Sequence, residues 1–186
     1  HPGGGTRNAL VSFGDGAYLE IIAPDPAQEM AGTNGARFER LERAELLHWA
    51  LRCDDLKQLG LELKDAGYVP GAILDMARRA PDGSDLRWQL MGVRDHHAAG
   101  LVPFFIDWQA TPHPTLSAPL VGALGSLGLR LPPDLPALEP LLAEVLSAYP
   151  DERSEDSKAG PGLRVAFDSP NGSQVLEGAA PKGFRF

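Results

Sequence analysis

The sequence has little cysteine, no long apolar run and no excess of basic residues. Cys53 is the one cysteine among 186 residues, so an internal disulfide bond is excluded. No apolar run reaches the roughly 18–20 residues that span a membrane, and no signal peptide is visible. The 17 Lys and Arg are scattered and outnumbered by 25 Asp and Glu, which excludes a basic stripe for nucleic-acid phosphates. We therefore expect a reducing compartment, the cytoplasm or an organelle interior, with neither nucleic acid nor membrane as partner.

What the chain does contain fits a folded protein with many short connections. Hydrophobic residues make up 43% of the sequence, which is ordinary for a globular protein. Glycine occurs 21 times and proline 17 times, which predicts many turns between strands. The length suits one domain with a sizeable core or two small fused modules. Cys53 lies in an apolar stretch, and we interpret it as a packed thiol before a catalytic one.

Three apolar stretches end in a carboxylate. These stretches end at Glu20, Asp107 and Glu177, and each follows a turn rich in Gly, Pro or Asp. A carboxylate at the end of a buried strand costs free energy unless a partner satisfies it. A repeated one suggests a duplicated module that carries a ligand at an equivalent place. The pattern therefore favours a metal or substrate site built between modules.

The first two thirds of the chain predict a hairpin followed by a strand-helix-strand unit. Alternating residues on both sides of a Gly-Asp-Gly turn predict a hairpin over 6–22, followed by a polar connection over 27–45. Asp55 is a good helix N-cap, and the leucine spacing after it predicts a helix that ends before Gly67. The expected strands of this unit are 47–53, 69–79, 86–93 and 101–108. The order is β-α-β-β-β.

The last third resembles the unit before it. We expect an extended stretch over 127–131, an amphipathic helix from Leu138 to near Tyr149 and a hairpin over 163–176. Residues 150–161 are charged and predict a mobile loop. Residues 1–22 then look like the back half of a module, 47–108 like a whole one and 119–178 like a variant. If the modules are alike, a strand and a helix belong before residue 1.

This repeat, with its carboxylate strand ends, resembles the vicinal oxygen chelate superfamily and, more narrowly, its glyoxalase-like domain subfamily. The resemblance covers about residues 1–178. The stretches that carry it are His1–Leu10, Gly14–Pro24, Ala50–Leu56, Arg79–Gly83 with Leu86–Trp88, Pro103–Trp108 and His113–Pro114. It implies an α+β fold in which paired βαβββ modules form a curved mixed sheet, a half-barrel. We expect the paired modules at 1–112 and an extra βαββ segment at 113–186.

The resemblance also implies a metal site and its ligands. In this superfamily a divalent metal sits inside the curved sheet, held by residues of the first and last strands. By position, Glu20, His48 and Asp107 would be the ligands, and Glu20 would also be the catalytic base. Carboxylate and imidazole suit Zn, Ni, Fe, Mn or Co. The third segment has the apolar Leu127 at the corresponding ligand position, and the fourth ligand position would lie before residue 1.

Other residues are candidates for holding the substrate. Arg7 or Arg78 would bind an anionic group, and Asn8, Trp88 and His113 would line the cavity. For at least two of the four strand arginines, Arg7, Arg78, Arg79 and Arg87, we favour a solvated outer face, and a rigid turn explains His113 about as well. Adjacent residues of an extended loop point apart, so Asp95-His96-His97 is a weak metal candidate.

We therefore favour a small-molecule enzyme, a metal-dependent lyase or isomerase of glyoxalase type acting on a small oxygenated substrate. Two alternatives stay open. One is a metal-free protein that binds a small ligand, and the other is a structural or assembly subunit without an active site. Exposed strand edges would also allow a homodimer.

Overall fold

The computed structural model describes residues 3–14, 16–79, 83–94, 98, 100–136, 138–151 and 160–179. The chain divides into two compact units. The hairpin unit comprises residues 1–45, 113–124 and 167–174, and the sheet unit comprises residues 46–112, 125–166 and 175–186. The predicted loop at 150–161 falls mostly on residues 152–159, which, like Asp95-His96-His97, lie outside the described residues.

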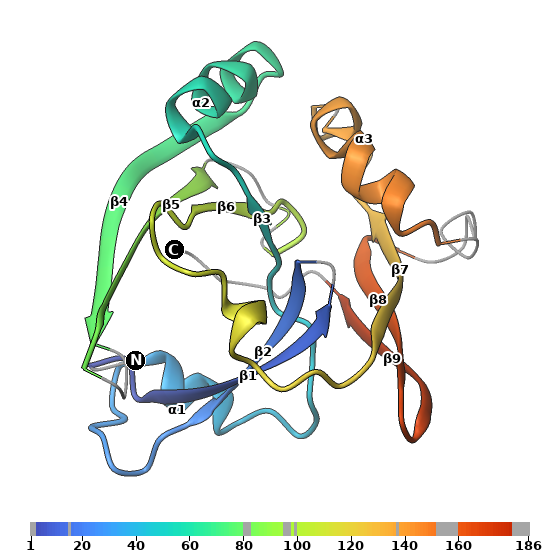
Figure 1. The fold of residues 1–186 in the computed structure, drawn as a ribbon. Helices are drawn as coiled ribbons and strands as arrows, with labels where there is room; N and C mark the ends of the chain where they lie inside the picture. The colour runs from blue at the N-terminus through green and yellow to red at the C-terminus, as the bar shows by residue number, and fades with distance from the viewer. Residues whose placement is uncertain are drawn as a thin grey trace. The chain divides into compact units, whose positions relative to one another are not determined.

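The hairpin unit is built on the antiparallel pair β1 (Thr6–Gly14) and β2 (Ala17–Pro24) (Figure 1), which confirms the hairpin predicted over 6–22. Gly14 has a φ of 74°, which favours glycine at this turn, and the register shifts between Ser12 and Gly14. Strand alternation places every second side chain on the same face. One face carries Asn8, Leu10, Ser12, Tyr18, Glu20 and Ile22.

Three short segments of the hairpin unit pack on this pair. The helix α1 (Asn34–Phe38) contacts β2, which confirms some helix in the connection predicted over 27–45. The 3-10 turn η1 (Pro114–Leu116) contacts β1 and β2. The segment that follows η1 runs parallel to β1, with Ser12 donating its N–H to the Pro119 carbonyl at 2.8 Å and accepting from Val121 at 2.9 Å. The segment that follows η1 therefore extends the hairpin along the edge of β1.

The sheet unit contains a four-stranded sheet in the order β3-β6-β5-β4. β3 pairs parallel with β6, and the other pairs are antiparallel. The strands are β3 (Ala50–Arg52), β4 (Val69–Arg79), β5 (Asp85–Arg94) and β6 (Phe104–Asp107). With α2 between β3 and β4, the β-α-β-β-β order predicted for 47–108 is confirmed.

Two of these strands are shorter than predicted. β3 begins at Ala50 and not at residue 47, and β6 begins at Phe104 and not at residue 101. The polypeptide turns before β6, where the Leu101 N–H donates to the Ala98 carbonyl at 2.9 Å. The Trp49 indole N–H donates to the Leu101 carbonyl at 2.7 Å. A hydrogen bond from a side chain therefore occupies a carbonyl that the prediction had placed in a strand.

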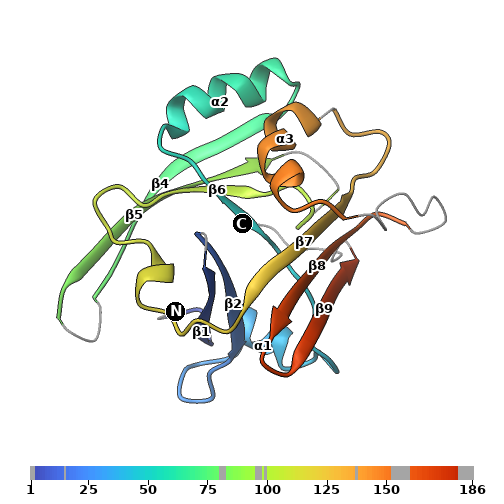
Figure 2. The same cartoon turned by 45° about the vertical axis from the view of Figure 1, so that its right-hand side comes forward.

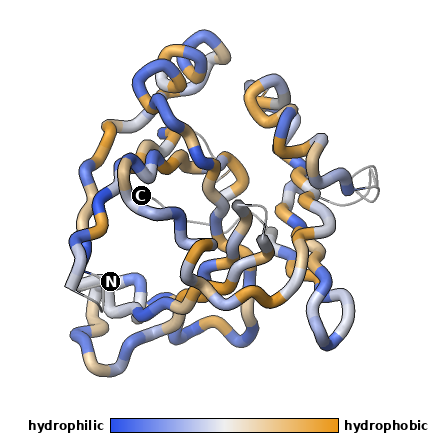
Figure 3. The backbone as a smooth tube through the Cα atoms, viewed as in Figure 1, coloured by the Kyte–Doolittle hydropathy of each residue, from blue (hydrophilic) through white to orange (hydrophobic). Residues whose placement is uncertain are grey.

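The helix α2 (Leu56–Asp65) covers one face of this sheet, where it contacts β4 and β6 (Figure 2). Its N-terminus is capped as predicted, because an Asp55 carboxylate oxygen accepts the N–H groups of Lys57 and Gln58 at 3.0 and 2.9 Å. Leu56 and Leu63 are buried and Leu59 packs against the same core, whereas Leu61 is exposed among the hydrophilic residues of the helix (Figure 3). Gly67, with a φ of 87°, follows the helix as expected for a glycine after a C-terminus.

The two faces of the four-stranded sheet differ. The α2 side carries core residues, namely Leu51, Ile73, Met91 and Phe105. The other side carries Leu74, Met76, Leu86, Trp88, Leu90 and Ile106. A β-bulge in β4 shifts the pairing of β4 with β5 by one residue, because Gly71 and Ala72 together lie opposite the single residue Gly92.

The last third of the chain forms the predicted strand, helix and hairpin. These are β7 (Ala123–Arg130), α3 (Glu139–Ala148), β8 (Gly162–Ser169) and β9 (Gly172–Ala179). The three strands form a sheet in the order β7-β8-β9, and the unit boundaries fall within them. Leu138 and Leu142 are fully buried and join the hydrophobic cluster of Leu63 and Phe105. The core of the sheet unit thus includes residues of both helices.

An ion-pair cluster holds charged residues of the last third together. Arg164 on β8 pairs with Asp151 at 3.1 Å and with Glu177 on β9 at 3.3 Å. The Arg164 and Asp151 side chains are 11% and 4% exposed, whereas Glu177 is 70% exposed. The strand-end carboxylate of this segment therefore forms an ion pair at the surface.

The fold class is α+β with mixed sheets, as predicted. A continuous half-barrel is not among the hydrogen-bonded sheets of the described residues, which contain two, four and three strands. None of the helices in the described part of the chain has the length and apolarity needed to cross a membrane.

Candidate functional site

Two of the predicted site residues meet on one face of the β1–β2 hairpin. The Asn8 side-chain amide donates to a Glu20 carboxylate oxygen at 2.6 Å. In the register Asn8 lies opposite Ile22 and Glu20 lies opposite Leu10, so the two side chains are diagonal neighbours on the same face. Glu20 is exposed and Asn8 half-buried. The amide fixes one carboxylate oxygen in place.

His113 belongs to the same face through Tyr18. The His113 and Tyr18 rings meet edge to face, with centroids 5.5 Å apart and planes 69° apart. His113 is the N-cap residue of η1, and its Nδ1 accepts the Thr115 N–H at 3.4 Å and lies 2.8 Å from Thr115 Oγ1. Tyr18 and Glu20 are two residues apart on β2 and share a face. We call Asn8, Tyr18, Glu20 and His113 the hairpin cluster.

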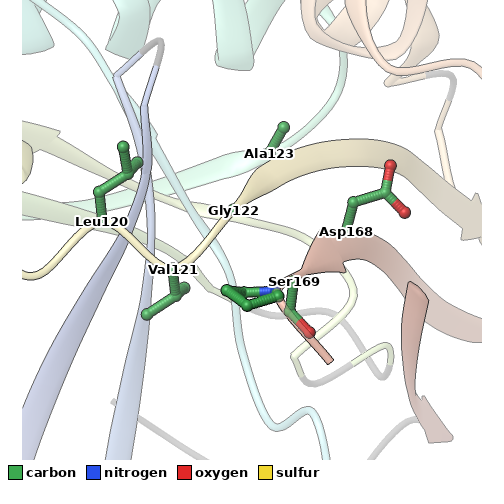
Figure 4. A pocket seen from close by; sticks show the side chains of 7 residues that line it. Leu120, Val121, Gly122, Ala123, Asp168 and Ser169 are labelled. Carbon is green, nitrogen blue, oxygen red and sulfur yellow. The ribbon is translucent and has the colours of Figure 1, made fainter. Parts of the chain in front are cut away.

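The hairpin unit also has a shallow apolar hollow of about 470 Å³ (Figure 4). Its lining residues are Leu120, Val121, Gly122, Ala123, Asp168, Ser169 and Pro170. Gly122 passes so close to the Asp168 carbonyl oxygen that a Cβ there would collide with it. Asp168 accepts a hydrogen bond from the Ser173 hydroxyl at 2.5 Å. The hollow therefore offers packing surface and little chemistry.

The sheet unit places two tryptophans together on the side away from α2. Trp88 on β5 and Trp108, directly after β6, have ring centroids 5.8 Å apart and planes tilted by 38°. Met76 pairs with Trp88 in the register, and Leu74 pairs with Leu90. We call Leu74, Met76, Leu86, Trp88, Leu90 and Trp108 the tryptophan face. Trp88 was a predicted substrate-binding residue, and its partner Trp108 was not.

Asp107 lies on the opposite side of the sheet from the tryptophan face. It pairs with Gln89 in the register and alternates with Ile106, so its Cβ is on the side of Phe105 and α2. A carboxylate oxygen of Asp107 accepts the Gln109 N–H at 2.7 Å, and Gln109 has a φ of 50°. The side chain thus closes the turn that ends β6.

The remaining predicted residues are placed as follows. His48 precedes β3 and is half-buried, with its Nε2 atom shielded from solvent. Arg7 is exposed on the face of β1 opposite to Asn8 and Glu20. Arg78 is exposed on β4 and pairs with Leu86. Glu20 belongs to the hairpin unit, and His48 and Asp107 belong to the sheet unit, so the three-ligand set stays a prediction.

Cys53 follows β3 and is half-buried against the core. Burial raises the pKa of its thiol, and the nearby carboxylates of Asp54, Asp55 and Asp107 raise the pKa further. A raised pKa disfavours the nucleophilic thiolate. These surroundings agree with the packed thiol expected from the sequence.

Residues 1–146 match the family model of the glyoxalase-like domain. The chain belongs to the glyoxalase-like domain family. Among solved structures, a hypothetical protein from Staphylococcus aureus is similar in fold, with a TM-score of 0.50 at 15% identity over 94% of this chain and 72% of that one. No curated protein matches the chain.

The donor groups of this glyoxalase-like domain only partly suit a metal ion. Within either unit, no three His, Cys, Asp or Glu side chains of the described residues gather as an ion would require. Glu20 and His48 have the right donor chemistry. Asp107 fits less well, because one of its oxygens closes a turn on the α2 side of the sheet.

Sequence reasoning missed two members of the glyoxalase-like domain's candidate surfaces. Tyr18 is two residues before Glu20, so strand alternation alone predicts that the two share a face. Trp108 is one residue beyond Asp107, and the same alternation places it with Ile106. The signal was therefore present in both cases. The sequence did not predict the register of β5 and β6, which brings the Trp88 and Trp108 rings into contact.

Proposed function

We propose that this glyoxalase-like domain is a small-molecule enzyme, a lyase or isomerase that removes a proton from carbon next to an oxygen-bearing carbon. The hydrogen bond from Asn8 to Glu20 carries the proposal. It holds one carboxylate oxygen of an exposed strand-end glutamate on the face that also carries Tyr18 and His113. A carboxylate in a fixed orientation is suited to act as a general base.

The roles follow from the chemistry of each group. Glu20 would take the proton while the Asn8 amide holds one of its carboxylate oxygens. Asn8 would keep that carboxylate aligned, since an amide N–H donates to a carboxylate and cannot take its proton. His113 would meet an oxygen of the substrate, with its ring held by Thr115 on one side and Tyr18 on another.

The proposal includes the metal site and module pairing that the family resemblance implies. Glu20 and His48 would hold a divalent ion, and Asp107 would complete the predicted set. Such an ion supplies a Lewis acid that stabilises an oxyanion. The proposal also keeps the expected paired βαβββ modules over residues 1–112, with residues 113–186 as the additional segment.

Solvent exchange at carbon tests the base directly. The metal-loaded chain is incubated in D₂O with glycolaldehyde, hydroxyacetone and dihydroxyacetone, and loss of the C–H signals is followed by NMR. We expect Glu20→Gln to slow exchange by about 100-fold or more, the usual contribution of a general base. Asn8→Ala should slow it less, because it loosens the base without removing it.

Glu42→Gln is the matched control, because Glu42 is also an exposed glutamate of the hairpin unit but lies outside the cluster. Elemental analysis of three proteins, the wild type, Glu20→Gln and Glu42→Gln, measures the bound metal. Metal lost in Glu20→Gln and kept in Glu42→Gln supports the ligand role. Exchange that is equal in all three proteins, or absent from the wild type with every probe, contradicts the enzyme.

A metal-free ligand-binding protein is the second candidate, and the tryptophan face favours it. This face exposes apolar side chains on a sheet, with Leu74 54% and Met76 37% exposed. A protein that binds without chemistry needs such a surface and does not need Glu20. Ligand binding that persists in Glu20→Gln, without exchange in any protein, would favour this candidate.

A further inference from the structure

The tryptophan face has a continuous row of large side chains across three strands. Met76 on β4 lies opposite Trp88 on β5, and Trp88 lies beside Trp108 at the end of β6. The adjoining row contains Leu74 and Leu90, which also pair in the register. The row is therefore an ordered apolar surface that is set by strand pairing and belongs wholly to the sheet unit.

This surface is unusual because its members remain accessible. Leu74 is 54% exposed and Met76 is 37% exposed, while Trp88 and Trp108 are half-buried. On the α2 side of the same sheet, Met91 and Phe105 are 2% and 3% exposed. Contiguous exposed apolar side chains commonly mark a place where a ligand or partner binds.

Arg78 gives this surface a charge. It lies two residues beyond Met76 on β4 and pairs with Leu86, so it shares the face with Trp88. Its neighbour Arg79 points to the other face and forms an ion pair with Asp85 at 3.2 Å. No carboxylate of the described residues forms an ion pair with Arg78. A guanidinium at the edge of an aromatic surface selects an anion.

We propose that the tryptophan face binds a planar aromatic carboxylate. The ring would pack on the two indoles and Met76, and the carboxylate would accept hydrogen bonds from the Arg78 guanidinium. The inference stands on the sheet unit alone and does not depend on the chemistry proposed for Glu20. The expected ligand therefore has a flat apolar ring and one negatively charged group.

The strand pairing offers a matched control for Arg78. Arg87 on β5 is also exposed, and it lies opposite Ala77, one residue along β4 from Arg78. Alternation puts Arg87 on the α2 side of the sheet and Arg78 on the tryptophan face. Substituting either arginine removes the same charge from nearly the same place, but only Arg78→Gln removes it from the proposed site.

Calorimetric titration of the full chain with 2-naphthoate and with the neutral 2-naphthalenemethanol tests the proposal. We expect the wild type to bind naphthoate at least 10-fold more tightly than the alcohol. Arg78→Gln should weaken naphthoate binding about 10-fold and leave alcohol binding unchanged, since a hydrogen bond to a charged group is lost. Arg87→Gln should change neither. Trp88→Leu and Trp108→Leu should weaken both ligands.

Three results would overturn the proposal. The first is equal weakening of naphthoate by Arg78→Gln and Arg87→Gln, which would indicate a general charge effect. The second is no naphthoate binding by the wild type. The third is a dimer, seen in sedimentation, that Met76→Glu converts to monomer, because a second copy would then cover the face. Naphthoate binding that survives Glu20→Gln separates this inference from the proposed enzyme.

Discussion

The segment from Ala50 to Asp107 and the segment from Ala123 to Ala179 both begin with a strand, a helix and further strands, but they hold their carboxylates differently. In the first segment, Asp55 accepts two N–H groups of its own helix and Asp107 accepts the N–H of Gln109. In the second, Asp151 and Glu177 both pair with Arg164 on β8. The helix-cap and strand-end carboxylates of the first segment thus accept nearby backbone N–H groups, whereas Asp151 and Glu177 of the second pair with one arginine side chain.

This difference has an energetic consequence. A carboxylate that accepts backbone N–H groups at the surface loses little when the partner is disturbed, because water replaces it. A buried ion pair that loses one member leaves a charge without compensation. Substitutions in the last third of the chain should therefore have larger effects on stability than those at local carboxylates.

The largest expected effect is at Arg164. Arg164→Ala leaves the 4% exposed Asp151 side chain without its guanidinium, and we expect the free energy of unfolding to fall by about 3–5 kcal/mol. Urea unfolding followed by circular dichroism measures this. Glu177→Gln serves as the control, because Glu177 is 70% exposed and its pair should contribute less than about 1 kcal/mol. Similar losses in both variants would remove the contrast between the segments.

A smaller effect is expected at the cap of α2. Asp55→Ala removes the acceptor of two N–H groups, and we expect a loss of about 1 kcal/mol. Asp54→Ala is the neighbouring control. Asp54 is 79% exposed and pairs with the exposed Arg52, so its loss should stay within about 0.5 kcal/mol. An equal loss of stability in Asp54→Ala would show that the effect of Asp55→Ala does not come from the helix cap.

The smallest effect concerns Cys53 in the first segment. Burial raises its pKa above the ordinary 9.0, so the folded state keeps the thiol proton at a pH where the unfolded chain loses it. The stability from this group is complete below the unfolded pKa and is lost as pH rises through the folded pKa. Above about pH 9, the wild type should therefore lose stability relative to Cys53→Ala. Alkylation of the folded wild type at pH 8 should be slower than in urea.

The comparison also explains how much the sequence could predict. Asp55 stands directly before the leucine spacing of α2, so both the cap and the helix were predictable from neighbouring residues. The hairpin over β1 and β2 was predictable for the same reason. The partner of Arg164 was not, because Asp151 is 13 residues away in the chain and Glu177 is on the next strand. Long-range pairing has no local signature.

The candidate site divides in the same way. Asn8 and Glu20 were both predicted from the family resemblance, and strand pairing brings them within hydrogen-bond distance. Asp107 was predicted as a third ligand, and one of its carboxylate oxygens accepts the Gln109 N–H at the end of β6. The face on which a strand-end residue lies depends on register, which the sequence of one strand does not contain.

The β-bulge at Gly71 and Ala72 and the regular pairing that follows it differ in their sensitivity to length. The bulge itself can lose one residue, because the pairs on either side of it would stay as they are. One residue added between Ile73 and Leu74 would instead move every later position of β4 by one place relative to β5. Asp75 would then take the place of Met76 opposite Trp88, and a carboxylate would replace the thioether there. A single inserted codon, far from either tryptophan in the sequence, would thus erase the apolar row without altering any residue in it.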